Sequence, residues 1–329
     1  MSGGKVIFKH VHLSGLIDQR QIRIVPKPLS LVLIFFLLSL NAFGQISQGT
    51  AEDWILYEKA NAMFAQHEYG QALQLYKEAI SSAGIFPEAE MGVGDVFFEE
   101  GEFELARDQY EKAYEMRKGF KVPETQYGLL YRLADLYQSR EMYSQMEDSL
   151  LKIEMDDKKF SDSDGSRLIG QIWKNYKGKG IDHTLFLYQF DVPFAQAAHS
   201  RLGWFYYRSG LYEKAAQELL FAVIYKSTEM NAALHDMDVD YEFSNLSDLL
   251  AAAQSHKEIS SFASNGGFFK DLYYLAGASY GAGFPAHAAL LWKLLSASKL
   301  AGTYTALSAR QLKSPFMEKV FGTGRGGNY

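Results

Sequence analysis

The sequence repeats one pattern of small and aromatic residues, first after 34 residues and again later in the chain, and this repeat limits the possible fold more than any other feature. The three clearest copies are Ala60, Phe64, Tyr69, Ala72, Tyr76 and Ala79; Gly94, Phe98, Phe103, Ala106, Tyr110 and Ala113; and Gly203, Tyr207, Tyr212, Ala215, Leu219 and Ala222. Alanines seven residues apart lie on one face of a helix, where small side chains let paired helices approach closely. Because neither helix of a copy can bury its apolar face alone, the copies must stack on one another.

This pattern resembles the tetratricopeptide repeat, in which a first helix carries a small residue and an aromatic, and a second helix carries alanine, a large residue and alanine. Two looser copies begin near Leu130 and Leu272. The last of these has Pro285 in place of an aromatic, and we expect this proline to begin a helix. The resemblance implies an all-α fold, a right-handed α-solenoid of stacked helix-turn-helix repeats.

We expect the chain to be divided into seven segments. They are a leader and signal peptide (1–44), three repeats (45–155), a degenerate helical pair (156–195), a repeat (196–226), a helical insertion (227–266), a repeat-like pair (267–313) and a flexible tail (314–329). A Gly-Lys-Gly turn separates the two helices of the degenerate pair. The insertion contains a helix that Asn245 or Ser247 would cap.

An apolar run of about eleven residues, Ser30–Leu40, indicates export. A membrane span needs about 20 apolar residues, so the run is typical of a signal peptide rather than of a transmembrane helix. The small residues Ala42 and Gly44 predict cleavage between Gly44 and Gln45, with the periplasm as the destination. If the segment is not cleaved, it would attach the protein to a membrane.

The charge of the chain argues against nucleic acid as a partner. Residues 1–44 hold five of the 33 Lys/Arg and one of the 39 Asp/Glu residues, which leaves 28 basic and 38 acidic residues, a formal charge of −10, for residues 45–329. Nucleic-acid affinity comes largely from Lys and Arg that release counterions, so an acidic body binds phosphate backbones poorly. The chain has no cysteine, which excludes disulfides, thiolate metal sites and a cysteine nucleophile.

Three sequence patterns superficially suggest chemistry, and none completes a known motif. The eight histidines lack the H-E-x-x-H spacing of a zinc protease. The acids from Asp236 to Glu242 resemble a calcium loop, but Tyr241 and Ser247 occupy its required glycine and glutamate positions. The run 322–327 is rich in glycine but lacks the lysine of a phosphate loop. We therefore expect no enzyme, no cofactor and no metal site, with an enzyme built from scattered acids as the lowest-ranked hypothesis.

The resemblance also implies a partner-binding groove lined by the first helix of each repeat. Carried over to this sequence, the groove positions are Tyr57, Asn61, Phe64, Met91, Asp95, Phe98, Tyr131, Asp135, Gln138, Trp204 and Tyr207. The aromatic residues fit packing between helices equally well. Asp95 and Asp135 favour the groove, because a carboxylate is rarely buried without a partner.

The expected partner is a protein or peptide, and the residues at these positions indicate the chemistry of the segment that would bind. Chaperone-binding members of the family hold a terminal carboxylate with Lys and Asn, whereas here Asn61 is kept and Tyr57, Asp95, Tyr131 and Asp135 replace the rest. We therefore expect a basic or apolar protein segment rather than a terminal carboxylate in the groove. The alternative function is a structural subunit of an envelope complex that contacts its partners through the convex face or the 228–265 insertion.

Overall fold

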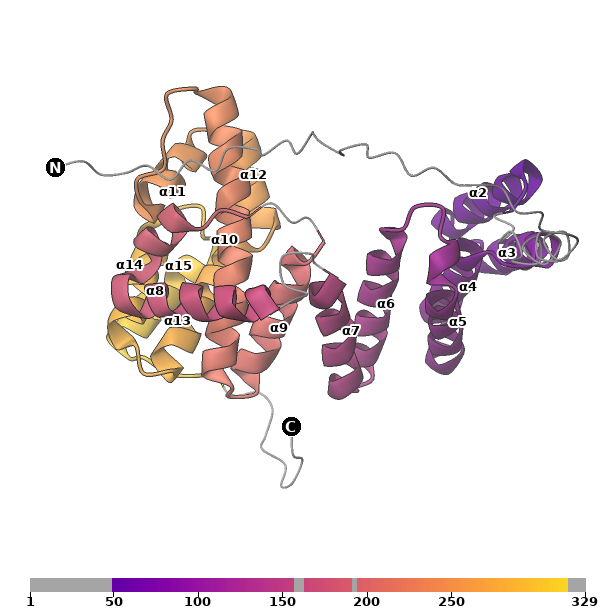
Figure 1. Ribbon diagram of the computed structural model, residues 1–329, viewed down its shortest axis with the longest axis horizontal. Helices are drawn as coiled ribbons and strands as arrows, with labels where there is room; N and C mark the ends of the chain where they lie inside the picture. The colour runs from indigo at the N-terminus through magenta and orange to yellow at the C-terminus, as the bar shows by residue number, and fades with distance from the viewer. Residues whose placement is uncertain (1–48, 157–162, 191–193, 319–329) are drawn as a thin grey trace, which may run out of the picture. The chain divides into compact units, whose positions relative to one another are not determined.

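The computed structural model describes residues 49–156, 163–190 and 194–318, and the regular elements in these ranges are all helical (Figure 1). The helices are α2 (Ala51–Ala65), α3 (Tyr69–Ala83), α4 (Pro87–Glu99), α5 (Phe103–Glu115), the 3₁₀ turn η2 (Arg117–Gly119), α6 (Thr125–Ser139), α7 (Tyr143–Asp156), α8 (Ser163–Leu187), α9 (Gln196–Arg208), α10 (Tyr212–Met237), α11 (Leu246–Gln254), α12 (Lys257–Asn265), α13 (Phe268–Gly281), α14 (Pro285–Ala297) and α15 (Thr303–Lys313). This architecture confirms the predicted all-α fold of stacked helical hairpins. The expected leader and signal peptide at 1–44 lie outside the described residues, as do tail residues 319–329.

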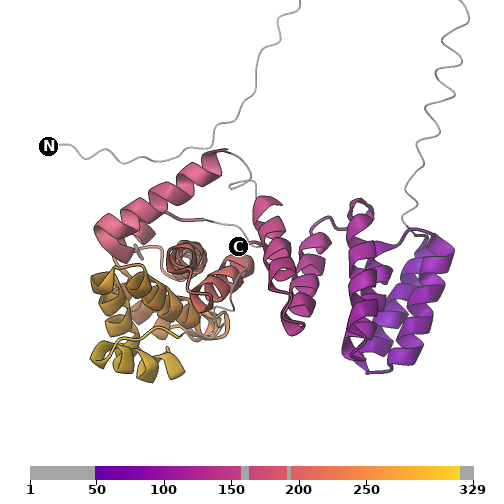
Figure 2. The same cartoon turned by 90° about the horizontal axis from the view of Figure 1, so that it is seen from below.

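Helices α2 to α7 form three hairpins that stack in chain order. Each helix from α2 to α6 packs against the next α-helix, and Figure 2 shows the hairpins from below. The small residues of the repeat lie where the helices meet: Ala72 and Ala106 are completely buried. A Cβ atom on Gly94 would lie 2.5 Å from the ring of Tyr110, so the glycine is required for this close approach.

Five hairpins in the described part of the chain, α2–α3, α4–α5, α6–α7, α9–α10 and α13–α14, share one turn geometry. The residue two positions before each second helix has a positive φ, which is the left-handed conformation that favours glycine. These residues are His67 (62°), Gly101 (80°), Glu141 (58°), Gly210 (80°) and Gly283 (90°). The turn therefore recurs before α3, α5, α7, α10 and α14, including the two hairpins whose sequence match is loose. Pro285 begins α14, as the sequence predicts.

The region after α7 departs from a simple stack. Helix α7 packs directly on α9, while α8 lies across α10 and also contacts α11 (Figure 1). Residues 163–187 are therefore docked on the side of later helices and do not occupy the place of a repeat between α7 and α9. The φ of Gly180, 79°, breaks α8 at the Gly-Lys-Gly turn.

Helix α10 is longer than the repeat pattern predicts. It continues to Met237, past the expected repeat boundary at residue 226, because Met230 and Leu234 are also buried and α11, α12 and α13 cover the helix. The side chain of Asn245 caps α11, because it accepts a hydrogen bond from the backbone N–H of Asp248 at 2.9 Å. Of the two predicted caps, Asn245 and Ser247, Asn245 is therefore the one that forms. None of the described helices combines the length and the apolar character that a membrane crossing needs.

The first residues of the expected tail are packed against the body. The side chain of Gln311 bonds both the N–H and the C=O of Phe316, and the backbone N–H of Glu318 donates to the hydroxyl of Tyr207 at 3.2 Å. The prediction of a flexible tail from residue 314 is therefore wrong for residues 314–318.

Candidate functional site: the face of the first helices

The eleven residues predicted for the groove all lie on the first helices of hairpins, and we call this set the first-helix face. They are Tyr57, Asn61 and Phe64 on α2; Met91, Asp95 and Phe98 on α4; Tyr131, Asp135 and Gln138 on α6; and Trp204 and Tyr207 on α9. Asp135 and Gln138 are exposed, whereas Met91 and Tyr207 are buried at 7% and 1% exposure. The remaining seven are partly buried. The buried pair cannot contact a partner, so the prediction for Met91 and Tyr207 is wrong.

Tyrosines of the second helices hold two polar residues of the face in place. The hydroxyl of Tyr76 donates to Asn61 Oδ1 at 2.7 Å, and the hydroxyl of Tyr110 donates to Asp95 Oδ1 at 2.7 Å. Both bonds span 15 residues, and the two pairs are one 34-residue repeat apart. Burial raises the pKa of Tyr110, and the negative charge of Asp95 raises it further, so the phenol remains a donor. The repeat thus places an oriented polar group at the same position of successive first helices.

Asp95 also pairs with an arginine of the next hairpin. Arg132 Nε on α6 lies 2.6 Å from Asp95 Oδ1, so one oxygen receives both the tyrosine and the arginine. Burial lowers the pKa of Arg132, but the charge of Asp95 and the hydrogen bond to it outweigh burial and raise it. The second oxygen, Oδ2, takes part in neither bond. The carboxylate is therefore neutralised within the chain and ties α4, α5 and α6 together.

The third hairpin repeats the acid and arginine arrangement with different partners. Asp135 forms an ion pair with Arg201 of α9, and the guanidinium of Arg201 lies 5.8 Å from the ring centre of Tyr131. The Tyr131 hydroxyl donates to the backbone carbonyl of Phe194, just before α9. The side chain of Asp135 remains 58% exposed, so this pair, unlike that of Asp95, lies at the surface.

Trp204 belongs to a buried polar cluster and not to an open groove. Its Nε1 donates to Asp271 Oδ1 at 3.0 Å, while Lys270 Nζ lies 3.2 Å from the centre of its ring. Asp271 is completely buried and also binds Lys226 and Ser200. Sequence spacing placed Trp204 correctly on a first helix, but α13 covers one side of it.

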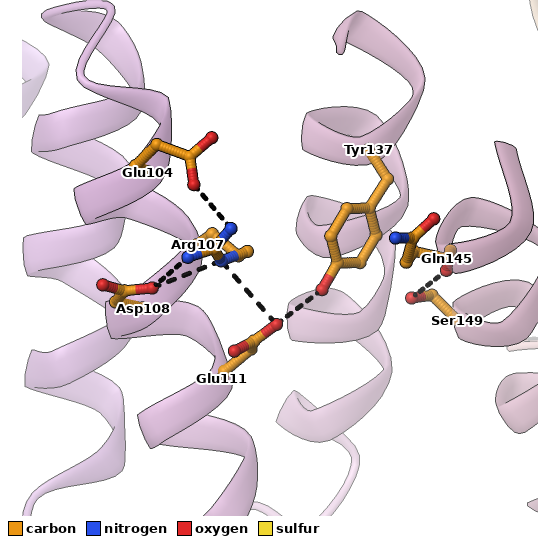
Figure 3. A network of polar contacts seen from close by, with 7 residues as sticks. All are labelled: Glu104, Arg107, Asp108, Glu111, Tyr137, Gln145 and Ser149. Carbon is orange, nitrogen blue, oxygen red and sulfur yellow. Dashed lines mark hydrogen bonds and ion pairs between the residues drawn. The ribbon is translucent and has the colours of Figure 1, made fainter. Parts of the chain in front are cut away.

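A separate network of charges lies at the surface of α5, the second helix of the second hairpin. In Figure 3, Arg107 on α5 meets Glu104 at 2.5 Å and Asp108 at 2.7 Å, and it approaches Glu111 at 4.0 Å. The hydroxyl of Tyr137 on α6 donates to Glu111 Oε1 at 2.8 Å (Figure 3). The exposed pair Asp108–Arg107 is therefore the counterpart, on a second helix, of the pair Asp135–Arg201 on the first-helix face.

Among comparisons with known proteins, the match to a family model agrees with this architecture. A family model described as "Tetratricopeptide repeat" matches residues 57–119. An uncharacterized protein of Treponema pallidum (strain Nichols) is 24% identical over 226 residues, which cover 68% of this chain. The chain spans only 60% of that relative's length. A solved structure, the TPR2AB-domain:pHSP90-complex of yeast Sti1, is 14% identical with a TM-score of 0.30 and covers 80% of this chain and 96% of its own.

Proposed function

Because the chain is a tetratricopeptide repeat protein, we propose that it is a protein-interaction scaffold that binds a segment of a partner along the first-helix face of α2, α4 and α6. The observation that carries this proposal is the repeated hydrogen bond from a tyrosine to Asn61 and to Asp95. These bonds fix the two polar groups before any partner binds, and preorganisation reduces the entropy that binding costs. Partly exposed Phe64 and Phe98 flank them and offer aromatic contact area.

The ion pairs on the face change the partner class that the sequence suggests. Asp95 and Asp135 would favour a basic segment if they were free, but each is paired with an arginine of a neighbouring helix. Each aspartate–arginine pair therefore presents a hydrogen-bond donor beside an acceptor and carries little net charge. A segment with apolar side chains, whose backbone amides meet these donors and acceptors, fits this surface better than a strongly basic one.

Reversal of the exposed charge on the face tests the proposal. Asp135→Lys would place an ammonium beside Arg201, so we expect at least a tenfold loss in capture of the partner. The partner is first identified by crosslinking in cells and mass spectrometry, and binding of the purified full chain to it is then measured.

The matched control is Asp108→Lys on α5. Asp108 is 57% exposed, against 58% for Asp135, and it also pairs with an arginine. We expect this variant to bind as the parent does. Equal binding by all three proteins, with unchanged helical circular dichroism, would contradict the assignment of the first-helix face.

The loop between α10 and α11 supports a second candidate function, a structural subunit that contacts its complex through this loop. Val239 is 77% exposed and Met237 is 47% exposed at the end of α10. Exposed apolar side chains that lie close together can mark a contact site, and these two are two residues apart in the sequence. Photocrosslinking from Val239 and from Gln138 separates this candidate from the first-helix face.

A further inference from the structure

Three potential metal ligands from three helices converge beside α9. Glu154 Oε1 on α7 lies 2.9 Å from His199 Nδ1, and Glu218 Oε2 on α10 lies 2.7 Å from the same nitrogen. The three donor atoms all lie within 4.8 Å of one another. His199 is 3% exposed, and the side chains of Glu154 and Glu218 are 13% and 19% exposed. The cluster is thus enclosed on the protein side but still reached by solvent through the glutamates.

The two glutamates share a single hydrogen of the histidine. Nδ1 can carry one hydrogen, and Glu218 Oε2 is the acceptor with hydrogen-bond geometry. Glu154 Oε1 is buried and has no hydrogen bond, although it lies close to the same nitrogen. A buried carboxylate oxygen without a donor is costly, and the two carboxylates also repel each other. A single proton on Nδ1 therefore has to serve two carboxylates, whereas a metal cation among the three side chains could bind all three donor atoms at once.

We propose that Glu154, His199 and Glu218 bind a divalent transition-metal ion, with zinc as the reference ion. One imidazole nitrogen and two carboxylate oxygens are a common ligand set for zinc. Zinc bonds to these atoms are about 2.0–2.2 Å long, which separates ligands by about 3.3 Å, so each glutamate needs to move outward by only about half an ångström. Water would complete the coordination on the exposed side.

The packing around His199 suits a metal ligand. Its ring stacks on Phe221 with centres 5.1 Å apart and an interplanar angle of 20°, and Tyr225 lies 5.8 Å away. These contacts fix the direction of Nδ1 toward the glutamates. The nitrogen donor favours zinc over magnesium and calcium, which prefer oxygen ligands.

The position of the cluster gives the ion a structural role within the scaffold. Glu154 belongs to the third hairpin, whereas His199 and Glu218 belong to the hairpin formed by α9 and α10. Helix α7 packs directly on α9 at this junction. A bound ion would therefore fasten these two hairpins together at the point where the chain between them leaves the regular repeat.

Calorimetric titration of the full chain, without an affinity tag, tests the proposal with Zn²⁺ as the probe and Mg²⁺ as the comparison. We expect saturable binding of one Zn²⁺ per chain and none of Mg²⁺ at the same concentrations. Glu154→Gln and Glu218→Gln keep the shape of the side chain but remove an anionic ligand, and each should weaken binding at least tenfold. Helical circular dichroism checks that both variants are folded.

The control is His235→Gln, because His235 is an exposed histidine beside the exposed acids Asp236 and Asp238 and would be the alternative place for adventitious zinc to bind. This variant should bind Zn²⁺ as the parent does. Visible absorption of the unaltered chain with Co²⁺ provides a readout that needs no variant, since the bands report coordination. The proposal would be overturned by the absence of saturable Zn²⁺ binding, or by binding that His235→Gln abolishes and Glu218→Gln leaves unchanged.

Discussion

Replacing Asp271 by alanine is expected to lower the free energy of unfolding by about 3–5 kcal/mol. Its carboxylate is completely buried, and Oδ2 lies 2.5 Å from Lys226 Nζ and 2.9 Å from Ser200 Oγ. Burial raises the pKa of Asp271, and the charge of Lys226 acts against that rise. Without the carboxylate, the buried ammonium of Lys226 has no counter-charge and Trp204 Nε1 loses its acceptor. Urea unfolding followed by helical circular dichroism measures the change.

The double variant Lys226→Met with Asp271→Leu separates the value of the ion pair from the cost of breaking it. Removing both charges and filling the space with apolar atoms is often nearly neutral, so the double variant should be clearly more stable than Asp271→Ala. The single variant unfolding at the same urea concentration as the parent would mean that α9, α10 and α13 do not enclose this cluster in solution.

Replacing Ala106 by arginine is expected to cost more than about 3 kcal/mol, the second large effect. Ala106 is completely buried at the centre of the second hairpin, where α5 packs against α4 and α6. The longer side chain would overpack this contact and bury a charge without a partner. Thermal unfolding of the full chain, followed by circular dichroism, measures the loss.

The control for this variant is Leu105→Arg, one residue earlier on α5. Leu105 is 46% exposed, so its arginine would reach solvent and should change stability by less than about 1 kcal/mol. If Ala106→Arg melted like the parent, the alanines would not face the partner helix and the repeat register would be wrong.

The sequence predicts the hairpins because their packing depends on residues that are close along the chain. Ala72 and Tyr76, with their counterparts Ala106 and Tyr110, set the contact between the two helices of a hairpin and also the contact with the next hairpin. The helix start at Pro285 likewise depends on local chemistry. Local signals of this kind can be identified without knowledge of the tertiary structure.

The residues of the first-helix face could be listed from the sequence, but their environment could not. The arginine that pairs with Asp95 is 37 residues away, and the arginine that pairs with Asp135 is 66 residues away. Tyr207 is covered in part by a segment 111 residues later. These long-range contacts depend on how the hairpins stack, so spacing alone does not reveal them.

The same reason explains why no sequence motif indicates the proposed metal site. Motif searches recognise ligands at fixed spacings on one element. Glu154, His199 and Glu218 lie on three helices and meet only because α7 packs on α9 and α9 packs on α10.

Site-specific photocrosslinking in cells tests the central claim most directly. A photoreactive residue is placed in turn at Gln138 on α6, at Gln74 on α3 and at Val239 in the loop after α10, all of which are exposed. The proposed function predicts a partner adduct from Gln138 and none from the other two positions. Adducts from Gln74 or Val239, with none from Gln138, would contradict binding along the first-helix face.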